Sequence, residues 1–170
     1  IRAWYFEAAQ LKQAILKGLG LLNTKIDKLH NDSHTDPMTG LFNRRAMQQM
    51  LDDYQAQSLP LAVIALDIDH FKTINDHFGH DVGDAVIVSL ATLMQQDLRA
   101  DAALCRSGGE EFLLLLPGVS GVQAERIAER LRRRVESHEM GQAGRITSSL
   151  GVAHWPGDAS DLGAVLKQAD

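Results

Sequence analysis

The chain has little cysteine and no long apolar segment. Cys105 is its only cysteine, which excludes an intrachain disulfide and is typical of a reducing compartment. The longest aliphatic run, Leu113 to Leu116, is far shorter than the roughly 20 residues that a membrane span needs. The N-terminus has no signal-peptide pattern. We therefore expect a cytoplasmic domain, although its parent protein could be anchored in a membrane.

The chain also lacks an excess of positive charge. Its net charge is −5, so no overall basic field favours nucleic acid. It contains no Gly-x4-Gly-Lys-Ser/Thr phosphate loop, and any phosphate would have to be held mainly through a metal ion. The 170 residues suffice for one domain and an appendage. Because the first residue is Ile1 rather than Met, we expect a piece of a larger protein.

Residues 4–31 predict one long helix. Apolar residues recur at heptad spacing, with Lys12 as a polar exception, and predict a coiled-coil seam formed by Ala8, Ile15, Leu19, Leu22, Ile26 and Leu29. Such a helix either packs on its own domain or pairs with a second copy, and we favour a dimerising stalk over residues 1–32.

The remaining residues, 33–170, predict a mixed domain. Helices are expected at 44–57, 84–98 and 120–138, with a short one before Gly79, and strands at 61–69, 102–105, 112–116 and 145–155. This order suggests an α+β sandwich in which helices lie on one face of a mainly antiparallel sheet. Residues 161–170 resemble the start of a further helix that the chain does not complete.

The segment from Gly108 to Phe112 is the most informative motif. Gly108 and Gly109 separate two apolar strands, which predicts a hairpin whose Gly-Gly turn supplies positive φ angles. Glu110 and Glu111 follow immediately, although a tight turn does not require acids. These acids therefore indicate chemistry at a place where backbone can approach a ligand.

A second acidic motif ends the predicted strand 61–69. Asp67 and Asp69 point to the same side of that strand, and Asp67 follows six apolar residues, so we expect it to be held near the core. A buried carboxylate needs a cation or an altered pKa. Together with Glu110 and Glu111, these acids predict a hard-oxygen site suited to Mg²⁺ and phosphate. A structural cap or a salt bridge would also explain the Asp-x-Asp pair.

The segment after Asp69 adds groups that suit a nucleotide. Lys72 can neutralise phosphate, while Asn75 and Asp84 offer the amide and carboxylate that read a guanine edge. A zinc site built from the nearby histidines is disfavoured, because their spacing matches no common zinc pattern and no cysteine pair supports them.

Four stretches together resemble the GGDEF domain of bacterial diguanylate cyclases, in its Gly-Gly-Glu-Glu-Phe form. They occur in the order and at the spacing of that family: 36–45 (DPMTGLFNRR), 67–76 (DIDHFKTIND), 79–84 (GHDVGD) and 106–112 (RSGGEEF). A weaker fifth stretch runs from Thr147 to Gly151. The resemblance covers about residues 33–170.

The resemblance implies a palm-like nucleotidyl-cyclase fold, with a central sheet flanked by helices. It also implies condensation of two GTP into cyclic di-GMP and two pyrophosphates, with Mg²⁺ (Mn²⁺ possible) and two domains facing each other antiparallel. An upstream sensor domain would control the enzyme through the stalk. The alternatives are a non-catalytic module that senses GTP or cyclic di-GMP and a purely structural dimerisation unit.

The resemblance also assigns roles to residues. The metal ligands would be Asp67, the Ile68 carbonyl, Glu110 and Glu111, the last two also being the catalytic acids. The nucleotide would be bound by Phe71, Lys72, Asn75, Asp84, Gly108 and Gly109.

Two departures from the family pattern carry further expectations. The family's inhibitory product site has the pattern Arg-x-x-Asp. Arg99 is in place, but Ala102 occupies the Asp position and Asp101 comes one residue early. We therefore predict weak or absent product inhibition. The family also continues past Asp170 with a helix that carries a Lys and an Arg for the triphosphate, so the domain is expected to be truncated there.

Overall fold

The computed structural model describes residues 15, 17–22, 25, 29 and 33–157. The chain divides into two compact units, 1–33 and 34–170, and each is described by itself. In the first unit, the described residues 15, 17–22, 25 and 29 are helical, as expected for the stalk. The rest of the predicted stalk and the helix expected at 161–170 lie outside the described residues.

The second unit contains a four-stranded antiparallel sheet in the order β2-β3-β1-β4. Its strands are β1 (Leu61–Ile68), β2 (Ala103–Gly108), β3 (Glu111–Pro117) and β4 (Ser148–Trp155). Its helices are α2 (Arg44–Ala56), α3 (Phe71–Phe78), α4 (His80–Gln95) and α5 (Gly121–Ser137), with a short 3-10 helix η1 (Gly141–Ala143).

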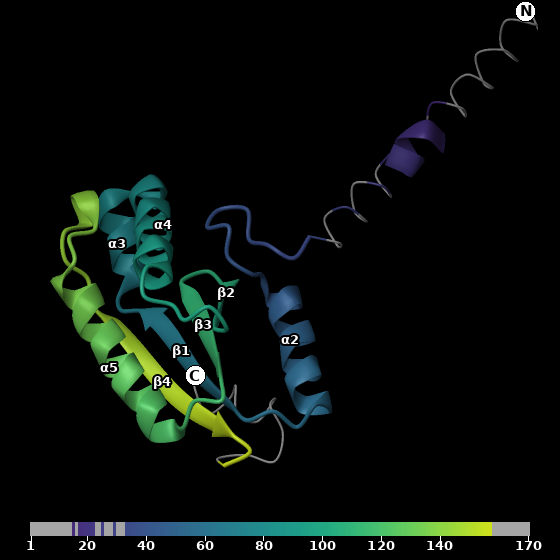
Figure 1. Cartoon of the computed structure of the whole chain (residues 1–170). Coiled ribbons are helices and arrows are strands. Elements are labelled where there is room, and N and C mark those ends of the chain that lie inside the picture. The colour runs from purple at the N-terminus through teal and green to yellow at the C-terminus, as the bar shows by residue number, and fades with distance from the viewer. Residues whose placement is uncertain (1–14, 16, 23–24, 26–28, 30–32, 158–170) are drawn as a thin grey trace, which may run out of the picture. The chain divides into compact units, whose positions relative to one another are not determined.

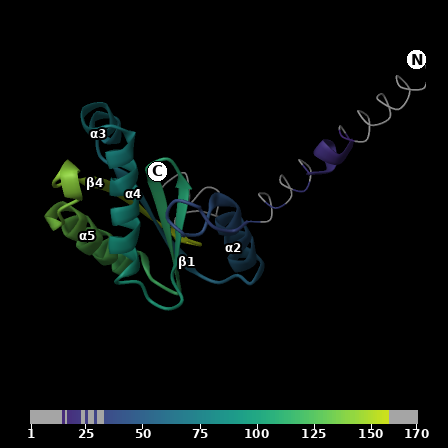
Figure 2. The ribbon, with the colours of Figure 1, turned by 90° about the horizontal axis from the view of Figure 1, so that it is seen from above.

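Helices cover both faces of this sheet (Figure 1). Residues alternate between the two faces along a strand, and the buried residues of β1 divide accordingly. Ala62, Ile64, Leu66 and Ile68 pack with residues of α4 and α5, whereas Leu61, Val63 and Ala65 pack with Met47 and Leu51 of α2. The mainly antiparallel sheet is confirmed, but the expectation of helices on one face was wrong. Figure 2 shows α2 on the side of the sheet opposite to α4 and α5.

Local sequence signals explain where the helices begin. The Asn43 side chain accepts a hydrogen bond from the Ala46 amide and caps α2. Ser120 and Gln123 form a capping box at the start of α5. Gly79, at φ 89°, ends α3 and immediately precedes α4. This positive φ, which suits glycine, lets α4 begin at His80 rather than at the expected Asp84.

The segment from His34 to Asn43 forms a closed loop on the outer edge of β2. Its ends are joined by the Asn43 amide, which donates to the His34 carbonyl over 2.9 Å. Phe42 then pairs with Cys105 of β2 in a one-residue parallel bridge. This loop covers part of an edge strand whose backbone groups would otherwise face solvent.

Candidate functional site

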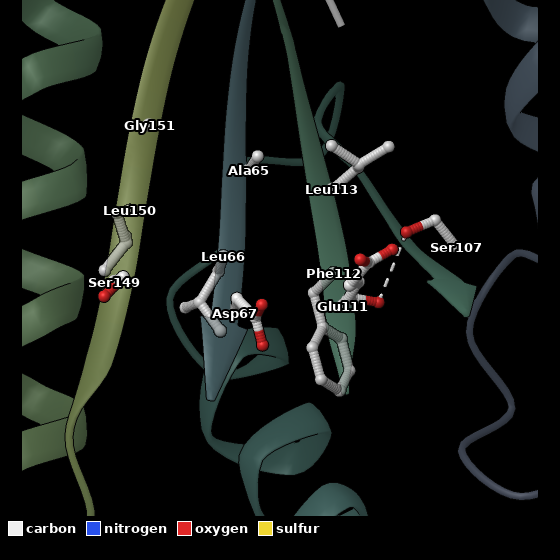
Figure 3. A pocket seen from close by; sticks show the side chains of 10 residues that line it. All are labelled: Ala65, Leu66, Asp67, Ser107, Glu111, Phe112, Leu113, Ser149, Leu150 and Gly151. Atoms are coloured by element: carbon white, nitrogen blue, oxygen red, sulfur yellow. Dashed lines mark hydrogen bonds between the residues drawn. The ribbon is translucent and has the colours of Figure 1, made fainter. Parts of the chain in front are cut away.

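The hairpin between β2 and β3 brings its acids to the end of β1. Glu111 is the first residue of β3 and lies directly opposite Asp67 in the β1–β3 register. Cross-strand neighbours have Cβ atoms about 4.5–5.5 Å apart, so the two carboxylates share one end of the sheet. Figure 3 shows both side chains at the mouth of the same pocket.

The turn differs from the predicted Gly-Gly turn. Gly108 is the last residue of β2 and pairs with Glu111, so the two turn residues are Gly109 and Glu110. Gly109 has a φ of 37°, and Gly108 is not among the residues with positive φ. A register shift between Arg106 and Gly108 marks a bulge at Ser107, which displaces the expected pairing by one residue.

A pocket of about 390 Å³ opens at this end of the sheet. Its polar lining comes from all four strands: Asp67 of β1, Ser107 of β2, Glu111 of β3 and Ser149 of β4. The Ser107 hydroxyl donates to the Glu111 carbonyl over 3.4 Å. Ser107 and Ser149 were not singled out in the sequence analysis, because the bulge and the strand register that bring them here leave no local signal.

Asp67 is exposed, and the expectation of a carboxylate held near the core was wrong in this respect. Partial burial, followed by repulsion from Glu110, Glu111 and Asp69, raises the pKa of Asp67, while a hydrogen bond from the Ile68 backbone opposes the rise. The crowded negative charge at this end of the sheet is of the kind that a cation relieves.

Asp69 has a different environment. Its carboxylate accepts hydrogen bonds from the Ser149 hydroxyl at 2.5 Å and from the Thr147 hydroxyl at 2.7 Å. Burial acts to raise the pKa of Asp69, but these two bonds and the nearby His70 outweigh it and hold the pKa below its usual range. Asp69 is therefore engaged with β4, whereas Asp67 faces the pocket.

The nucleotide-binding candidates lie on the adjoining helices. Phe71 and Lys72 are the first two residues of α3, and Asn75 is its fifth. The Asn75 Oδ1 atom is buried and has no hydrogen-bond partner in the described part of the chain. Asp84 is exposed on α4, one residue after Gly83, whose Cα approaches Asn75 so closely that an added Cβ would lie 1.8 Å from Oδ1.

Arg106 connects the hairpin turn to the loop 34–43. Its guanidinium donates to the Gly109 carbonyl from Nε at 2.9 Å and from an Nη atom at 2.8 Å. A second Nη atom contacts the Asp36 carboxylate at 3.1 Å, and both side chains are largely buried, at 13% and 17% exposed. Both residues fall within recognised motifs, but no local sequence signal predicted that they would meet.

The donor set suits a hard divalent cation. Asp67, Glu110, Glu111 and the Ile68 carbonyl offer only oxygen atoms, which Mg²⁺ and Mn²⁺ prefer. No three Asp, Glu, His or Cys side chains of the described residues converge as a ready-made ligand cluster. The fit therefore rests on donor chemistry and on the shared strand ends, with the backbone carbonyl and phosphate oxygens completing the set.

Comparisons with known proteins agree with this architecture. The family described as the diguanylate cyclase GGDEF domain matches residues 33–170. The response regulator PleD of Caulobacter vibrioides is 41% identical over 145 residues, which are 80% of this chain and 32% of PleD. The probable diguanylate cyclase DgcT of Escherichia coli is 35% identical over 147 residues, 82% of this chain and 32% of DgcT.

A solved structure extends the likeness to the fold. The GGDEF domain of DgcB from Caulobacter crescentus, determined in complex with c-di-GMP, has a TM-score of 0.73 and 32% identity over 82% of this chain and 86% of that one. The chain spans about a third of the length of PleD and DgcT. None of its described helices is both long and apolar enough to cross a membrane. On the family match and these identities, the chain belongs to the GGDEF-domain family of diguanylate cyclases.

Proposed function

We propose that this domain condenses two GTP molecules into cyclic di-GMP and two pyrophosphates. The observation that carries the proposal is the pairing of Asp67 with Glu111 across adjacent strands, at the mouth of a pocket and beside the turn that holds Glu110. All the acids and glycines of the motif are present. A non-catalytic sensor of GTP or cyclic di-GMP would have no need for this complete acidic set.

The acidic end of the sheet would hold the metal. Asp67, the Ile68 carbonyl, Glu110 and Glu111 would bind Mg²⁺, or Mn²⁺ in its place, with phosphate oxygens as further ligands. When bound, such an ion polarises the α-phosphate and lowers the pKa of the attacking hydroxyl. Glu110 and Glu111 are also the acids that we assign to the chemistry, in roles that we do not divide between them.

The helices would hold the nucleotide. The buried, unpartnered Asn75 Oδ1 suits an N–H donor of guanine, and the Asp84 carboxylate accepts from the same edge. Lys72 and Phe71 would line the triphosphate. Gly108 and Gly109 leave the hairpin backbone without side chains where a phosphate would approach.

The reaction itself is a displacement at phosphorus. The 3′-hydroxyl oxygen of one GTP forms a bond to the α-phosphorus of the other, the bond to the bridging oxygen breaks, and pyrophosphate leaves with the electron pair. The hydroxyl proton passes to a carboxylate or to water. Two domains must face each other antiparallel for both displacements to occur, so the contribution of each domain is positioning and charge stabilisation.

Assembly and location belong to the same proposal. The described apolar residues of the stalk are at least half exposed within one chain, from 53% at Leu19 to 71% at Leu29, which supports pairing with a second copy. We propose that an upstream sensor domain acts through this stalk. A cytoplasmic location is compatible with the free, buried Cys105.

Chromatography of the reaction products tests the function. The protein is incubated with GTP and Mg²⁺ beside Glu110→Ala and Glu111→Ala variants, and Asp53→Asn on α2 serves as a control for a changed acid elsewhere. Cyclic di-GMP from the wild type and from the control alone is the expected result. If the wild type binds GTP but makes no product, the proposal of an enzyme would be rejected in favour of a non-catalytic sensor.

A further inference from the structure

The two acids of the Asp-x-Asp motif have separate partners. Asp69 accepts from the hydroxyls of Thr147 and Ser149 through its two different carboxylate oxygens. Its own amide donates to the Thr147 carbonyl over 3.0 Å. Three hydrogen bonds thus join Asp69 to Thr147, the residue just before β4, and to Ser149 in β4, immediately after β1 ends at Ile68. We call this arrangement of Asp69, Thr147 and Ser149 the β4 clasp.

The clasp determines the direction of the preceding carbonyl. The peptide bond between Ile68 and Asp69 is not among the cis bonds. In a planar trans peptide, the C=O points opposite to the N–H of the next residue. Because the Asp69 N–H points to β4, the Ile68 carbonyl points away from β4. In the order β2-β3-β1-β4, that is the side of β3.

The ladder with β3 does not extend to this carbonyl. The last pair of the β1–β3 register is Asp67 with Glu111. Ile68 therefore lies one residue further along, level with the turn formed by Gly109 and Glu110. The Asp67 side chain lines the pocket at this end of the sheet together with Glu111, the residue that follows the turn. A carboxylate and a carbonyl oxygen thus face the catalytic turn together.

We propose that Asp69 is a positioning residue whose clasp with Thr147 and Ser149 fixes the Ile68 carbonyl as an oxygen ligand facing the hairpin turn. The inference rests on the proposed function only in requiring a divalent cation at this end of the sheet. Asp69 acts through the peptide bond and does not ligate the cation itself, because each of its carboxylate oxygens already accepts a hydroxyl. Groups that orient a ligand in this way typically change metal affinity by about 10–100-fold when removed.

The clasp is placed where pairing between strands alone is weakest. Asp69 lies just beyond the last residue of β1, and the ends of regular elements fray. The side-chain bonds extend the attachment of β1 to β4 by one residue past the strand. The residue held in this way is Asp69, whose amide fixes the direction of the Ile68 carbonyl. The pairing of β1 with β4 does not itself require the clasp, because eight residue pairs from Leu61 to Ile68 already join the two strands.

Mn²⁺ binding, followed by electron paramagnetic resonance, tests the proposal. The wild type, Asp69→Asn and Thr147→Val are titrated with Mn²⁺ in the presence of a GTP analogue with a methylene group between its α- and β-phosphorus atoms. Asp69→Asn keeps the size of the side chain but loses an acceptor, and Thr147→Val keeps the shape but loses the hydroxyl. Asp53→Asn, on α2, is the charge-matched control.

We expect the Mn²⁺ dissociation constant to rise about tenfold or more in Asp69→Asn, to rise in Thr147→Val, and to stay at the wild-type value in Asp53→Asn. Thermal unfolding is recorded for each variant, and titrations are made well below the melting temperature. A lower melting temperature with unchanged Mn²⁺ affinity would mean that the clasp is merely structural and would overturn the proposal. If Asp69→Asn does not fold, unchanged affinity in Thr147→Val overturns it equally.

The product assay separates this inference from the proposed function. Wild type that makes no cyclic di-GMP but loses Mn²⁺ affinity through Asp69→Asn would contradict the cyclase and support the clasp. Wild type that makes cyclic di-GMP, with Mn²⁺ affinity unaltered by both substitutions, would support the cyclase and contradict the clasp. Wild type that binds no Mn²⁺ would contradict the clasp directly.

Discussion

Gly83 illustrates how one missing side chain can shape a binding site. The nearest atom to a Cβ added there is Asn75 Oδ1, at 1.8 Å, followed by Asn75 Cγ at 2.9 Å. No real contact is that short, so any side chain at position 83 displaces Asn75. The helix itself would tolerate the change, since alanine is favoured over glycine in a helix by about 1 kcal/mol.

We predict that Gly83→Ala weakens GTP binding about tenfold or more while leaving the melting temperature nearly unchanged. The displaced end of Asn75 is a flexible side chain and can move at little cost, but its carbonyl then leaves the guanine position. Binding of a fluorescent GTP analogue measures the effect. Gly121→Ala is the matched control, because its Cβ would meet only His154 at 3.8 Å. If Gly83→Ala bound the GTP analogue with wild-type affinity, the assignment of Asn75 to guanine recognition would be contradicted.

Asp67 supplies a prediction that depends on pH. Because its pKa is raised in the folded protein, the folded state binds the proton more tightly than the unfolded state does. The resulting stabilisation is present below the unfolded pKa of about 3.9 and is lost as the pH rises through the folded pKa. At neutral pH without metal, the ionised group is therefore unfavourable.

We expect Asp67→Asn to raise the melting temperature slightly at pH 7 in EDTA, by about 2 °C at most because the site is exposed and screened. The difference from wild type should disappear near pH 3, and Mg²⁺ should stabilise the wild type more than the variant. Calorimetry at both pH values, with and without Mg²⁺, makes the comparison. Equal stabilisation of both proteins by Mg²⁺ would exclude Asp67 as a ligand.

The exposure of Asp67 also marks a limit of prediction from sequence. Alternation along the strand correctly predicts the face of the sheet on which the Asp67 side chain lies, which is also the face of Val63 and Ala65. Whether a helix covers that end is a tertiary property. Met47 and Leu51 of α2 pack over the other end of the same face, against Leu61 and Val63. The burial of the Asn75 Oδ1 atom cannot be predicted from the sequence for the same reason, since it depends on the approach of α4.

At the scale of elements, the loop 34–43 and the hairpin are joined through one ion pair. Burial acts to raise the pKa of Asp36, but hydrogen bonds from Thr39 and Arg106 outweigh it, so the pKa lies below its usual range. The stabilisation that follows is present above the unfolded pKa of about 3.9 and is lost as the pH falls through the folded pKa.

We predict that Asp36→Asn lowers the free energy of unfolding by about 1.5–3 kcal/mol at pH 7, the range for hydrogen bonds to charged groups. The loss should shrink as the pH falls below about 4. Urea unfolding at several pH values measures it. Asp52→Asn on α2 is the control, because its carboxylate accepts a hydrogen bond from the exposed Gln48 amide at 3.0 Å. An equal loss in both variants would contradict the assignment.

The elements themselves were largely predictable, and their junctions were not. Apolar runs and helical periodicity predict the ends of β1, β3, α2 and α5 to within a few residues. The shift of α4 to His80 depends on the positive φ of Gly79, and the shift of the turn to Gly109 and Glu110 depends on the bulge at Ser107. Both depend on the backbone conformation of a single residue, which the pattern of apolar residues in the sequence does not reveal.

At the scale of the whole molecule, the stalk predicts concentration-dependent association. Leu22 lies on the predicted seam and is 57% exposed, while Leu21, one residue off the seam, is 62% exposed. We expect Leu22→Lys to shift the protein from dimer to monomer in sedimentation velocity and to reduce cyclic di-GMP formation at low protein concentration. Leu21→Lys should alter neither, because it places the same charge on the outer side of the pair. Dimers that persist in Leu22→Lys would contradict the seam.

Regulation by the product belongs to the same scale. Arg99 donates to Asp101 over 2.9 Å, and Ala102 offers no carboxylate in the family's inhibitory position. We expect initial rates to be little changed by added cyclic di-GMP in the wild type and to fall in Ala102→Asp. Ala102→Asn supplies a side chain of similar size without the charge. Strong inhibition of the wild type would show that the Arg-x-x-Asp pattern is dispensable here.

The loop 34–43 has a further consequence, for tolerance to insertion. Its backbone is tied at several points at once, with the Asp36 amide donating to Leu41, Gly40 to Asp36, and Arg106 to Phe42 at 2.9 Å or less. One added residue would break the register of these bonds and pull Asp36 from Arg106, whatever its side chain. Exposed loops usually accept such additions. In this loop, the number of residues should therefore be as strictly maintained as their identity.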